Sequence, residues 1–134
     1  MVKYLLDTNI CIAWLKGNPS IKEKLSARSP EEISVSTINI AELFFGAYNS
    51  DRVKHNLDKL RNFISEVEII NLDITALEKY GELKTLLRKQ GNIIDEFDLL
   101  IAGICLANGL ILVTNNEKHF VCIEGLTVEN WLAS

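Results

Sequence analysis

Three acidic residues, Asp7, Glu42 and Asp98, each stand alone within apolar sequence. Burying an ionised carboxylate is costly unless a metal ion, a partner or a proton accompanies it. Mg²⁺ and Mn²⁺ prefer hard oxygen ligands in octahedral geometry. Three convergent carboxylates can hold such ions and leave coordination positions open for water and a phosphodiester. The pattern therefore predicts metal-assisted phosphodiester hydrolysis, with Mg²⁺ or Mn²⁺ as the cofactor.

The position of Asp7 predicts that it lies at the mouth of a site. It follows the apolar run VKYLL, which suits a buried strand, and residues 10–15 continue with helical spacing. In open α/β sheets, ligands bind at the carboxyl ends of strands, where a strand turns into a helix. Thr8 and Asn9 share this turn and are expected to support the metal water with oxygens or hydrogen bonds. The alternative role for Asp7 is to cap the following helix.

Glu42 is the only charged residue in a helix predicted from Ile38 to about Tyr48, with Thr37 as its N-cap. Apolar side chains occupy nearly every face of this helix, so we expect it to be buried. A carboxylate in that setting needs a metal, a proton or a partner. The alternative for Glu42 is a buried ion pair with a distant lysine or arginine.

The third acid is expected near the start of another helix. Asp95 stands where that helix should begin and is expected to cap it, which puts Asp98 in the first turn, where the helix dipole favours a carboxylate. Asp95 is therefore expected to cap or to support the ligands, and capping is the alternative for Asp98. The very apolar strand predicted over residues 110–113 ends on Thr114 and Asn116, which add polar groups at the same edge.

Composition limits the classes of function. The 134 residues suffice for one domain, expected over residues 1–134, and the net charge of −4 argues against a bulk electrostatic binder of nucleic acid. The three cysteines lack CxxC spacing, which favours buried thiols in a reducing cytoplasm. The start of the chain is not expected to act as a signal peptide, and the longest apolar run is too short to span a bilayer, so no membrane association is expected.

Strands that alternate with helices predict an α/β domain with a mainly parallel sheet. His55 and His119 are expected to be solvated or weakly capping rather than zinc ligands or triad bases. RNA contact would have to come from local positive charge, although any single cation also fits an ordinary solvated face. The candidates are Lys22, Lys24, Arg28, Arg52 and Lys54.

Five motifs in order, over essentially the whole chain, resemble a PIN domain, specifically the VapC toxins of bacterial toxin–antitoxin pairs. They are LLDTN (Leu5 to Asn9), STINIAELFFGA (Ser36 to Ala47), DLLIAG (Asp98 to Gly103), LILVTNN (Leu110 to Asn116) and LTVENW (Leu126 to Trp131). The resemblance implies a three-layer fold with a mainly parallel sheet of about five strands flanked by helices. It also implies an Mg²⁺- or Mn²⁺-dependent endoribonuclease that cleaves structured RNA, tRNA or rRNA, and so arrests translation.

The resemblance assigns the family's acidic set to Asp7, Glu42 and Asp98, and its fourth catalytic position to Asn116. An acid common in the following loop is replaced by His119, which implies one tightly held ion. The implied partners are a second copy of the chain and a VapB antitoxin, with which it forms a hetero-oligomer. The antitoxin tail lies across the toxin and can push a basic side chain among the acids, and operator DNA is bound only through the antitoxin.

Two other functions remain open. A catalytically silent PIN-like binding module would keep the fold for docking a partner without turnover. An aspartyl phosphotransfer domain would use Asp7 as its nucleophile. Dehalogenase-type members of that class normally carry a second acid two residues further on, where this chain has Asn9.

Overall fold

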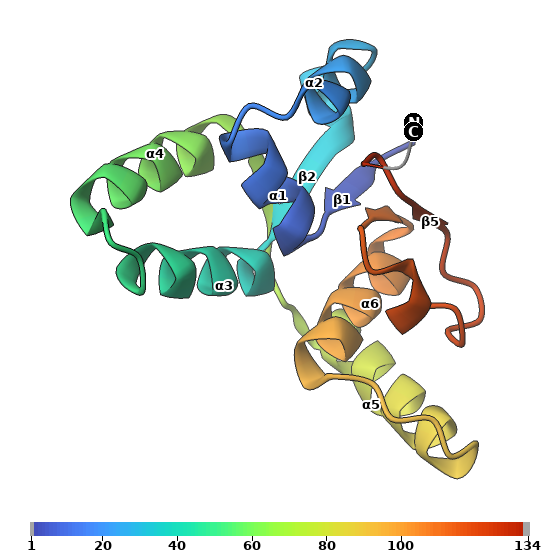
Figure 1. Cartoon of the computed structure of the whole chain (residues 1–134). Helices are drawn as coiled ribbons and strands as arrows, with labels where there is room; N and C mark the ends of the chain where they lie inside the picture. The colour runs from blue at the N-terminus through green and yellow to red at the C-terminus, as the bar shows by residue number, and fades with distance from the viewer. Residues whose placement is uncertain (1, 133–134) are drawn as a thin grey trace.

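The computed structural model describes residues 2–132 and is built on a five-stranded sheet in the order β3-β2-β1-β4-β5 (Figure 1). Every neighbouring pair of these strands is parallel. The strands are β1 (Tyr4–Leu6), β2 (Ile33–Ser36), β3 (Glu68–Ile70), β4 (Ile111–Val113) and β5 (Val128–Glu129). The predicted α/β class and parallel sheet are confirmed. The expectation of a single domain over residues 1–134 stays a prediction, and residues 1, 133 and 134 lie outside the described part.

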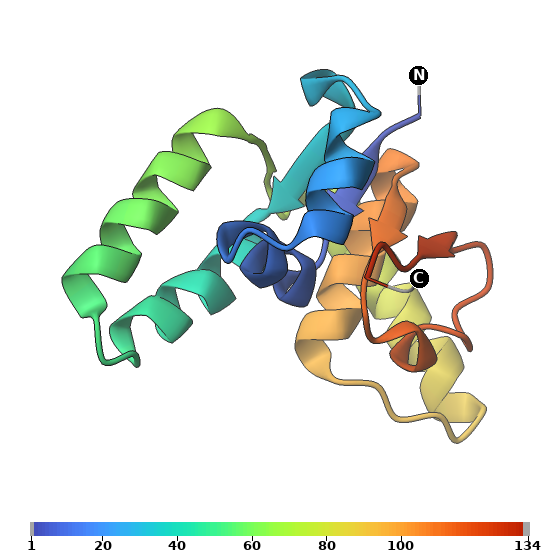
Figure 2. The ribbon, with the colours of Figure 1, turned by 45° about the horizontal axis from the view of Figure 1, so that its top comes forward.

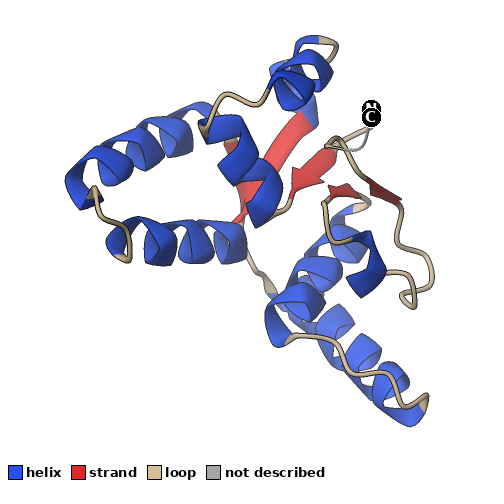
Figure 3. Cartoon of the chain, in the orientation of Figure 1, coloured by secondary structure: helices blue, strands red, loops and turns tan. Residues whose placement is uncertain are grey.

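Helices cover both faces of the sheet, as Figure 3 shows by colour. They are α1 (Thr8–Leu15), α2 (Pro19–Ser26), α3 (Thr37–Tyr48), α4 (Val53–Glu66), α5 (Ile74–Lys89) and α6 (Glu96–Asn108), with short 3-10 turns η1 (Pro30–Glu32) and η2 (Glu117–His119). Because side chains alternate along a strand, Leu6 and Leu5 face opposite sides of the sheet. Leu6 packs in the core formed with α1 to α4, and Leu5 packs in the core formed with α5 and α6. The result is the three-layer arrangement that the resemblance implied.

The break between α1 and α2 follows the sequence signals closely. Gly17 adopts a left-handed backbone with φ of 80° where α1 ends. The Asn18 side chain then caps α2 by accepting a hydrogen bond from the backbone of Ile21, and Pro19 occupies the first helical position. This stop and restart turns the chain so that β2 can pair with β1.

Two expectations about α3 are wrong. The N-cap is Ser36, not Thr37, because Ser36 and Asn39 form a reciprocal capping box. The helix is also not buried all round, since Phe45 is 72% and Tyr48 is 61% exposed. In Figure 1 the pair α3 and α4 projects sideways from the sheet. The outer face of α3 therefore has no neighbour in the described chain, and periodicity alone does not reveal this.

The expectation of buried thiols is confirmed for two of the three cysteines. All three are free; Cys11 and Cys105 are buried, whereas Cys122 is only half-buried. Burial raises the pKa of both thiols, which favours the uncharged form. The residues that the structure describes contain no helix with both the length and the apolar character needed to cross a membrane.

The α5–α6 contact depends on one glycine and generates a stability prediction. A Cβ at Gly103 would lie 2.8 Å from the Ala76 carbonyl oxygen and 3.3 Å from the Tyr80 nitrogen, because the two helices touch there. Gly103→Ala should therefore force the helices apart and lower the free energy of unfolding by about 1–3 kcal/mol.

The control is Gly81→Ala within α5, where an added Cβ would meet nothing within 4 Å. This change should stabilise the protein by about 0.5–1 kcal/mol, because alanine is the better helix former. Denaturant unfolding of the two variants and the parent protein measures both effects. Equal stability of Gly103→Ala and the parent would contradict the close packing.

Candidate active site

Polar groups from three neighbouring strands meet at the carboxyl edge of the sheet. Strands β2, β1 and β4 lie side by side and run in the same direction. Asp7 directly follows β1, Ser36 is the last residue of β2, and Thr114 directly follows β4. Figure 2 shows α3 and α6 beginning close to this edge. The parallel register therefore gathers side chains that lie far apart in the sequence.

Asp7 is held rigidly at the centre of this edge. It is 4% exposed and its two carboxylate oxygens accept three hydrogen bonds. One oxygen accepts from the Thr8 backbone at 2.8 Å and from Asn39 Nδ2 at 3.3 Å, and the other accepts from Thr114 Oγ1 at 2.8 Å. Asp7 is also the N-cap of α1, so its capping role and its place in the site coexist.

Asn39 belongs to the site and was missed by the sequence interpretation. It is fully buried, and its Oδ1 accepts from Ser36 Oγ at 2.6 Å. Its Nδ2 donates to Asp7 and, at 3.2 Å, to Thr8 Oγ1. The signal was present, because Asn39 lies three residues after Ser36, the capping-box spacing, and three residues before Glu42 on the same helix face.

Glu42 joins the same network through Thr8, whose Oγ1 donates to Glu42 Oε1 at 2.7 Å. Burial raises the pKa of the half-buried Glu42, the hydrogen bond from Thr8 lowers it, and the charges of Asp7, Asp98 and Asp95 raise it further. The alternative of an ion pair is not supported, because no lysine or arginine among residues 2–132 pairs with this carboxylate.

Asp98 enters the site from the first turn of α6. Asp95 is the N-cap, and its side chain accepts from the backbones of Phe97 at 3.0 Å and Asp98 at 3.4 Å. Burial raises the pKa of Asp98, and the charges of Asp7 and Asp95 add to the increase, whereas a hydrogen bond from His119 lowers it. His119 Nδ1 lies 3.1 Å from Asp98 Oδ2, so the expectation that this histidine is merely solvated or capping is wrong.

The remaining polar candidates fix the loop after β4. Asn9 Oδ1 accepts from the Asn115 backbone at 3.1 Å, and the Asn116 backbone donates to Thr114 Oγ1 at 3.0 Å. Asn130, a further residue that the sequence interpretation missed, bridges Asn115 Oδ1 at 3.2 Å and Glu117 Oε1 at 2.9 Å. The Asn116 side chain is exposed. These contacts hold the loop against α1 and the end of β5.

The basic candidates for RNA contact are not gathered at this edge. The guanidinium of Arg28 lies 4.8 Å from the ring centroid of Tyr4, which begins β1, so Arg28 is at the opposite edge from Asp7. Lys22 and Lys24 are on α2, and Arg52 and Lys54 are at the start of α4. Lys54 pairs with Asp58 at 3.2 Å on an exposed face. The five cations therefore form no common rim.

The donor set fits a divalent cation. Asp7, Glu42 and Asp98 form a negative cluster in which neighbouring charges raise the pKa of Glu42 and Asp98. None of the three acids pairs with a lysine or arginine within the described chain. Carboxylate oxygens are the ligands that Mg²⁺ and Mn²⁺ prefer, and a bound cation would offset this repulsion. No three acidic, histidine or cysteine side chains between residues 2 and 132 already stand at ligand spacing, so an ion would draw the acids together.

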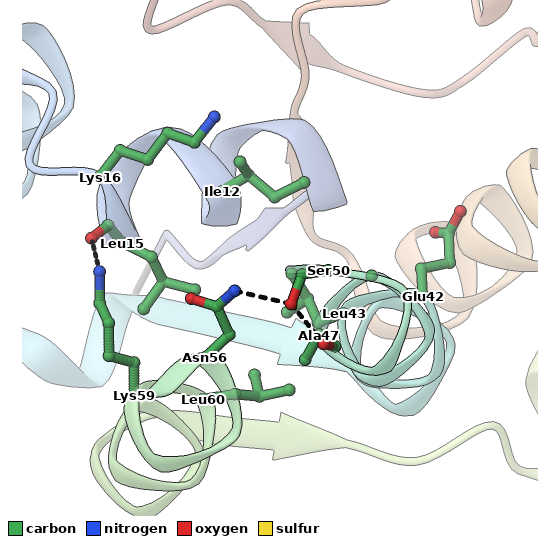
Figure 4. Close-up of a pocket in the computed structure, with 11 residues that line it drawn as sticks. Ile12, Leu15, Lys16, Glu42, Leu43, Ala47, Ser50, Asn56, Lys59 and Leu60 are labelled. Carbon is green, nitrogen blue, oxygen red and sulfur yellow. Dashed lines mark hydrogen bonds between the residues drawn. The ribbon is translucent and has the colours of Figure 1, made fainter. Parts of the chain in front are cut away.

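An apolar groove begins beside the acids. It has a volume of about 330 Å³ and lies between α1, α3 and α4, with Glu42 at one end and Lys16 and Lys59 at the other (Figure 4). Its walls are mainly apolar, with Ser50 and Asn56 as the polar members, and the apolar ones are Ile12, Leu15, Leu43, Gly46, Ala47 and Leu60. Lys59 Nζ donates to the Leu15 carbonyl at 2.9 Å and closes that end.

Known proteins match the chain over nearly its full length. The family model described as PIN domain matches residues 4–123. The tRNA(fMet)-specific endonuclease VapC of Shigella flexneri is 35% identical over 98% of this chain and 99% of its own. Ribonuclease VapC2 of Rickettsia felis is 41% identical over 96% of this chain and 97% of its own.

Solved structures agree with these matches. The crystal structure of DNA-bound VapBC from Salmonella typhimurium superposes with a TM-score of 0.91 and 34% identity, covering 98% of this chain and 99% of that chain. VapBC2 from Rickettsia felis, bound to a fragment of promoter DNA, gives a TM-score of 0.89 and 40% identity with the same coverage. The sequence motifs, the carboxyl-edge acids and these matches agree, and the chain therefore belongs to the VapC ribonucleases of the PIN domain family.

Proposed function

We propose that this protein is a metal-dependent endoribonuclease that hydrolyses phosphodiester bonds in structured RNA. The observation that carries the proposal is the cluster of Asp7, Glu42 and Asp98 at one sheet edge, with no lysine or arginine partner in the described chain. Relatives named tRNA(fMet)-specific endonuclease support tRNA as the substrate class and the cytoplasm as the place of action. RNA cleavage of this kind would arrest translation.

We assign Asp7, Glu42 and Asp98 as the ligands of one Mg²⁺ or Mn²⁺ ion. When bound, the ion supplies a water of lowered pKa and positive charge for the phosphodiester. Thr114 and Asn39 fix the orientation of the Asp7 carboxylate, and Thr8 links it to Glu42. For Asn116, whose side chain is exposed, we propose the role of hydrogen-bonding an RNA phosphate or the attacking water.

The two alternative functions fit less well. A silent binding module would retain Glu42 and Asp98, whose raised pKa values show that their charges are unfavourable where they stand, without using them. An aspartyl phosphotransferase of the dehalogenase type normally carries a second acid two residues after its nucleophile, and this chain has Asn9 there.

We also propose that the protein is the toxin of a toxin–antitoxin pair and binds an antitoxin protein. The solved VapBC structures support this partner, and those bound to DNA support operator binding by the complex. The apolar groove has the size and chemistry to receive an apolar segment of the antitoxin, and it ends at Glu42, where an acid could meet a basic side chain. The homodimer stays a prediction.

Replacing the acids should remove cleavage. Asp7→Asn, Glu42→Gln and Asp98→Asn should each lower kcat/KM on tRNA by about 100-fold or more, because ligand loss exceeds the 10- to 100-fold effect of losing a group behind a ligand. EDTA should abolish cleavage and added Mn²⁺ should restore it. His55→Ala, on an exposed face of α4, is the control. Full activity of the Asp7→Asn and Asp98→Asn variants would refute the assigned roles.

The same acids should limit the stability of the metal-free protein. Because the folded-state pKa of Glu42 and Asp98 is raised above 4.5 and 3.8, the folded protein binds protons more readily than the unfolded chain. The free energy of unfolding should therefore fall as pH rises through these pKa values and stay level above them.

At neutral pH, Glu42→Gln should raise the Tm of the metal-free protein by about 2–5 °C, the size expected from removing roughly 1 kcal/mol of repulsion. Mg²⁺ should raise the Tm of the parent protein more than that of the variant. Thermal unfolding with EDTA and with Mg²⁺ measures both effects. A lower Tm of the variant in EDTA would show that the acid is stabilising where it stands.

A charge in the groove should weaken antitoxin binding. Ile12 lines the groove and is 41% exposed, so Ile12→Glu should fold normally but cost about 1–3 kcal/mol of binding by burying a carboxylate against apolar side chains. Leu86→Glu is the matched control, since Leu86 is 47% exposed and lies on α5 outside the groove. Calorimetry with the protein encoded beside this toxin measures the difference. Equal affinities of both variants would place the antitoxin elsewhere.

A further inference from the structure

Asp98 is the one acid of the cluster that contacts a histidine. His119 Nδ1 lies 3.1 Å from Asp98 Oδ2. An ionised carboxylate can only accept hydrogen bonds, so the contact requires a hydrogen on Nδ1. Neutral histidine satisfies this in its Nδ1–H tautomer, with Nε2 left unprotonated. The Asp98 side chain is 18% exposed and that of His119 is 56% exposed, so the imidazole is the more solvent-exposed member of the pair.

The chain fixes the backbone of His119 firmly. The residue ends the turn η2, where its backbone nitrogen donates to the Asn116 carbonyl at 3.0 Å. The next residue, Phe120, is 1% exposed and anchors the loop in the core formed with α5 and α6. At the start of the same turn, Asn130 donates to Glu117 Oε1 at 2.9 Å. The loop that carries the imidazole is therefore held by contacts on both sides of His119, at Glu117 and at Phe120.

Only one oxygen of the Asp98 carboxylate has a hydrogen-bond partner within the described chain. A hollow of about 410 Å³ lies beside the pair, and both Asp98 and His119 line it, together with Asp95 and Lys118 among others. The contact engages Oδ2 alone, so Oδ1 remains available. A carboxylate with one oxygen fixed by a donor can offer the other to a cation in one orientation, which reduces the conformational freedom lost on binding.

We propose that His119 is a positioning residue for Asp98: its Nδ1–H holds Oδ2 so that Oδ1 is presented to the divalent cation. The inference rests on the proposed function, because it assigns the partner of a proposed ligand. It requires no change of protonation during the reaction. The imidazole acts through Asp98 and is not assigned a contact with the RNA.

The tautomer can be tested without metal or substrate. The chain has only two histidines, so a long-range ¹H–¹⁵N NMR spectrum of the imidazoles contains two ring systems, and His55→Ala assigns them. In the metal-free protein at about pH 8, above the ordinary histidine pKa of about 6.5, His119 should be the Nδ1–H tautomer. Asp98→Ala should remove this preference. An Nε2–H tautomer of His119 in the parent protein would overturn the proposal.

The effect on the ion is tested by Mn²⁺ titration of the same variants. His119→Ala should weaken Mn²⁺ binding by about 10- to 100-fold, the usual cost of losing a hydrogen-bond partner of a ligand. His119→Asn should restore most of the affinity, because the asparagine Nδ2 is bonded to Cγ as the imidazole Nδ1 is and also donates. His55→Ala should bind as the parent protein does. Parental affinity in His119→Ala, or failure of His119→Asn to rescue, would overturn the proposal.

Cleavage kinetics separate this proposal from the proposed function. If His119→Ala binds Mn²⁺ more weakly but regains the parental kcat at saturating Mn²⁺, with KM for RNA unchanged, the histidine acts only through the ion. A kcat that stays low at saturating Mn²⁺ would overturn the positioning role in favour of a direct role in the reaction. A parent protein that binds no Mn²⁺ and cleaves no RNA would overturn both proposals. If the parent protein is active and His119→Ala binds Mn²⁺ as tightly as the parent does, only this proposal is overturned.

Discussion

Electrostatic repulsion among three carboxylates is the constraint on which the site depends. Parallel pairing of β2, β1 and β4 brings their carboxyl ends together, and the helices that begin there carry Glu42 and Asp98 towards Asp7. The fold disperses the charge with neutral donors rather than cations, since Thr8, Asn39 and Thr114 all donate into the cluster. The donors leave the net negative charge intact, and that charge is the property a divalent cation requires.

The number of hydrogen bonds that each carboxylate receives follows its burial. The carboxylate most shielded from solvent, Asp7, receives three hydrogen bonds, whereas Glu42 receives one from Thr8 and Asp98 meets one histidine. The better solvated acids need less support from the protein. The core on each side of the sheet then holds the strands in register, and the close α5–α6 contact at Gly103 fixes the helix that carries Asp98.

Much of this was predictable from sequence, for identifiable reasons. Asp7, Glu42 and Asp98 stood out because each interrupts apolar sequence, and parallel β-α units send such residues to one edge. Asp95 was predicted as a cap because capping is local and follows from residue type and spacing. The position of α3 was not predictable, because exposure of Phe45 and Tyr48 depends on where the helix lies relative to the sheet. The contacts of Asn39 and His119 also escaped, since they join residues 32 and 21 positions away.

Asn39 makes α3 and the catalytic edge inseparable. One face of its amide completes the cap of α3 with Ser36, and the other holds Asp7 and Thr8. A single side chain thus both caps a helix and orients a carboxylate that lies 32 positions earlier in the chain. One substitution at position 39 should therefore disturb the start of α3 and the orientation of the Asp7 carboxylate at the same time.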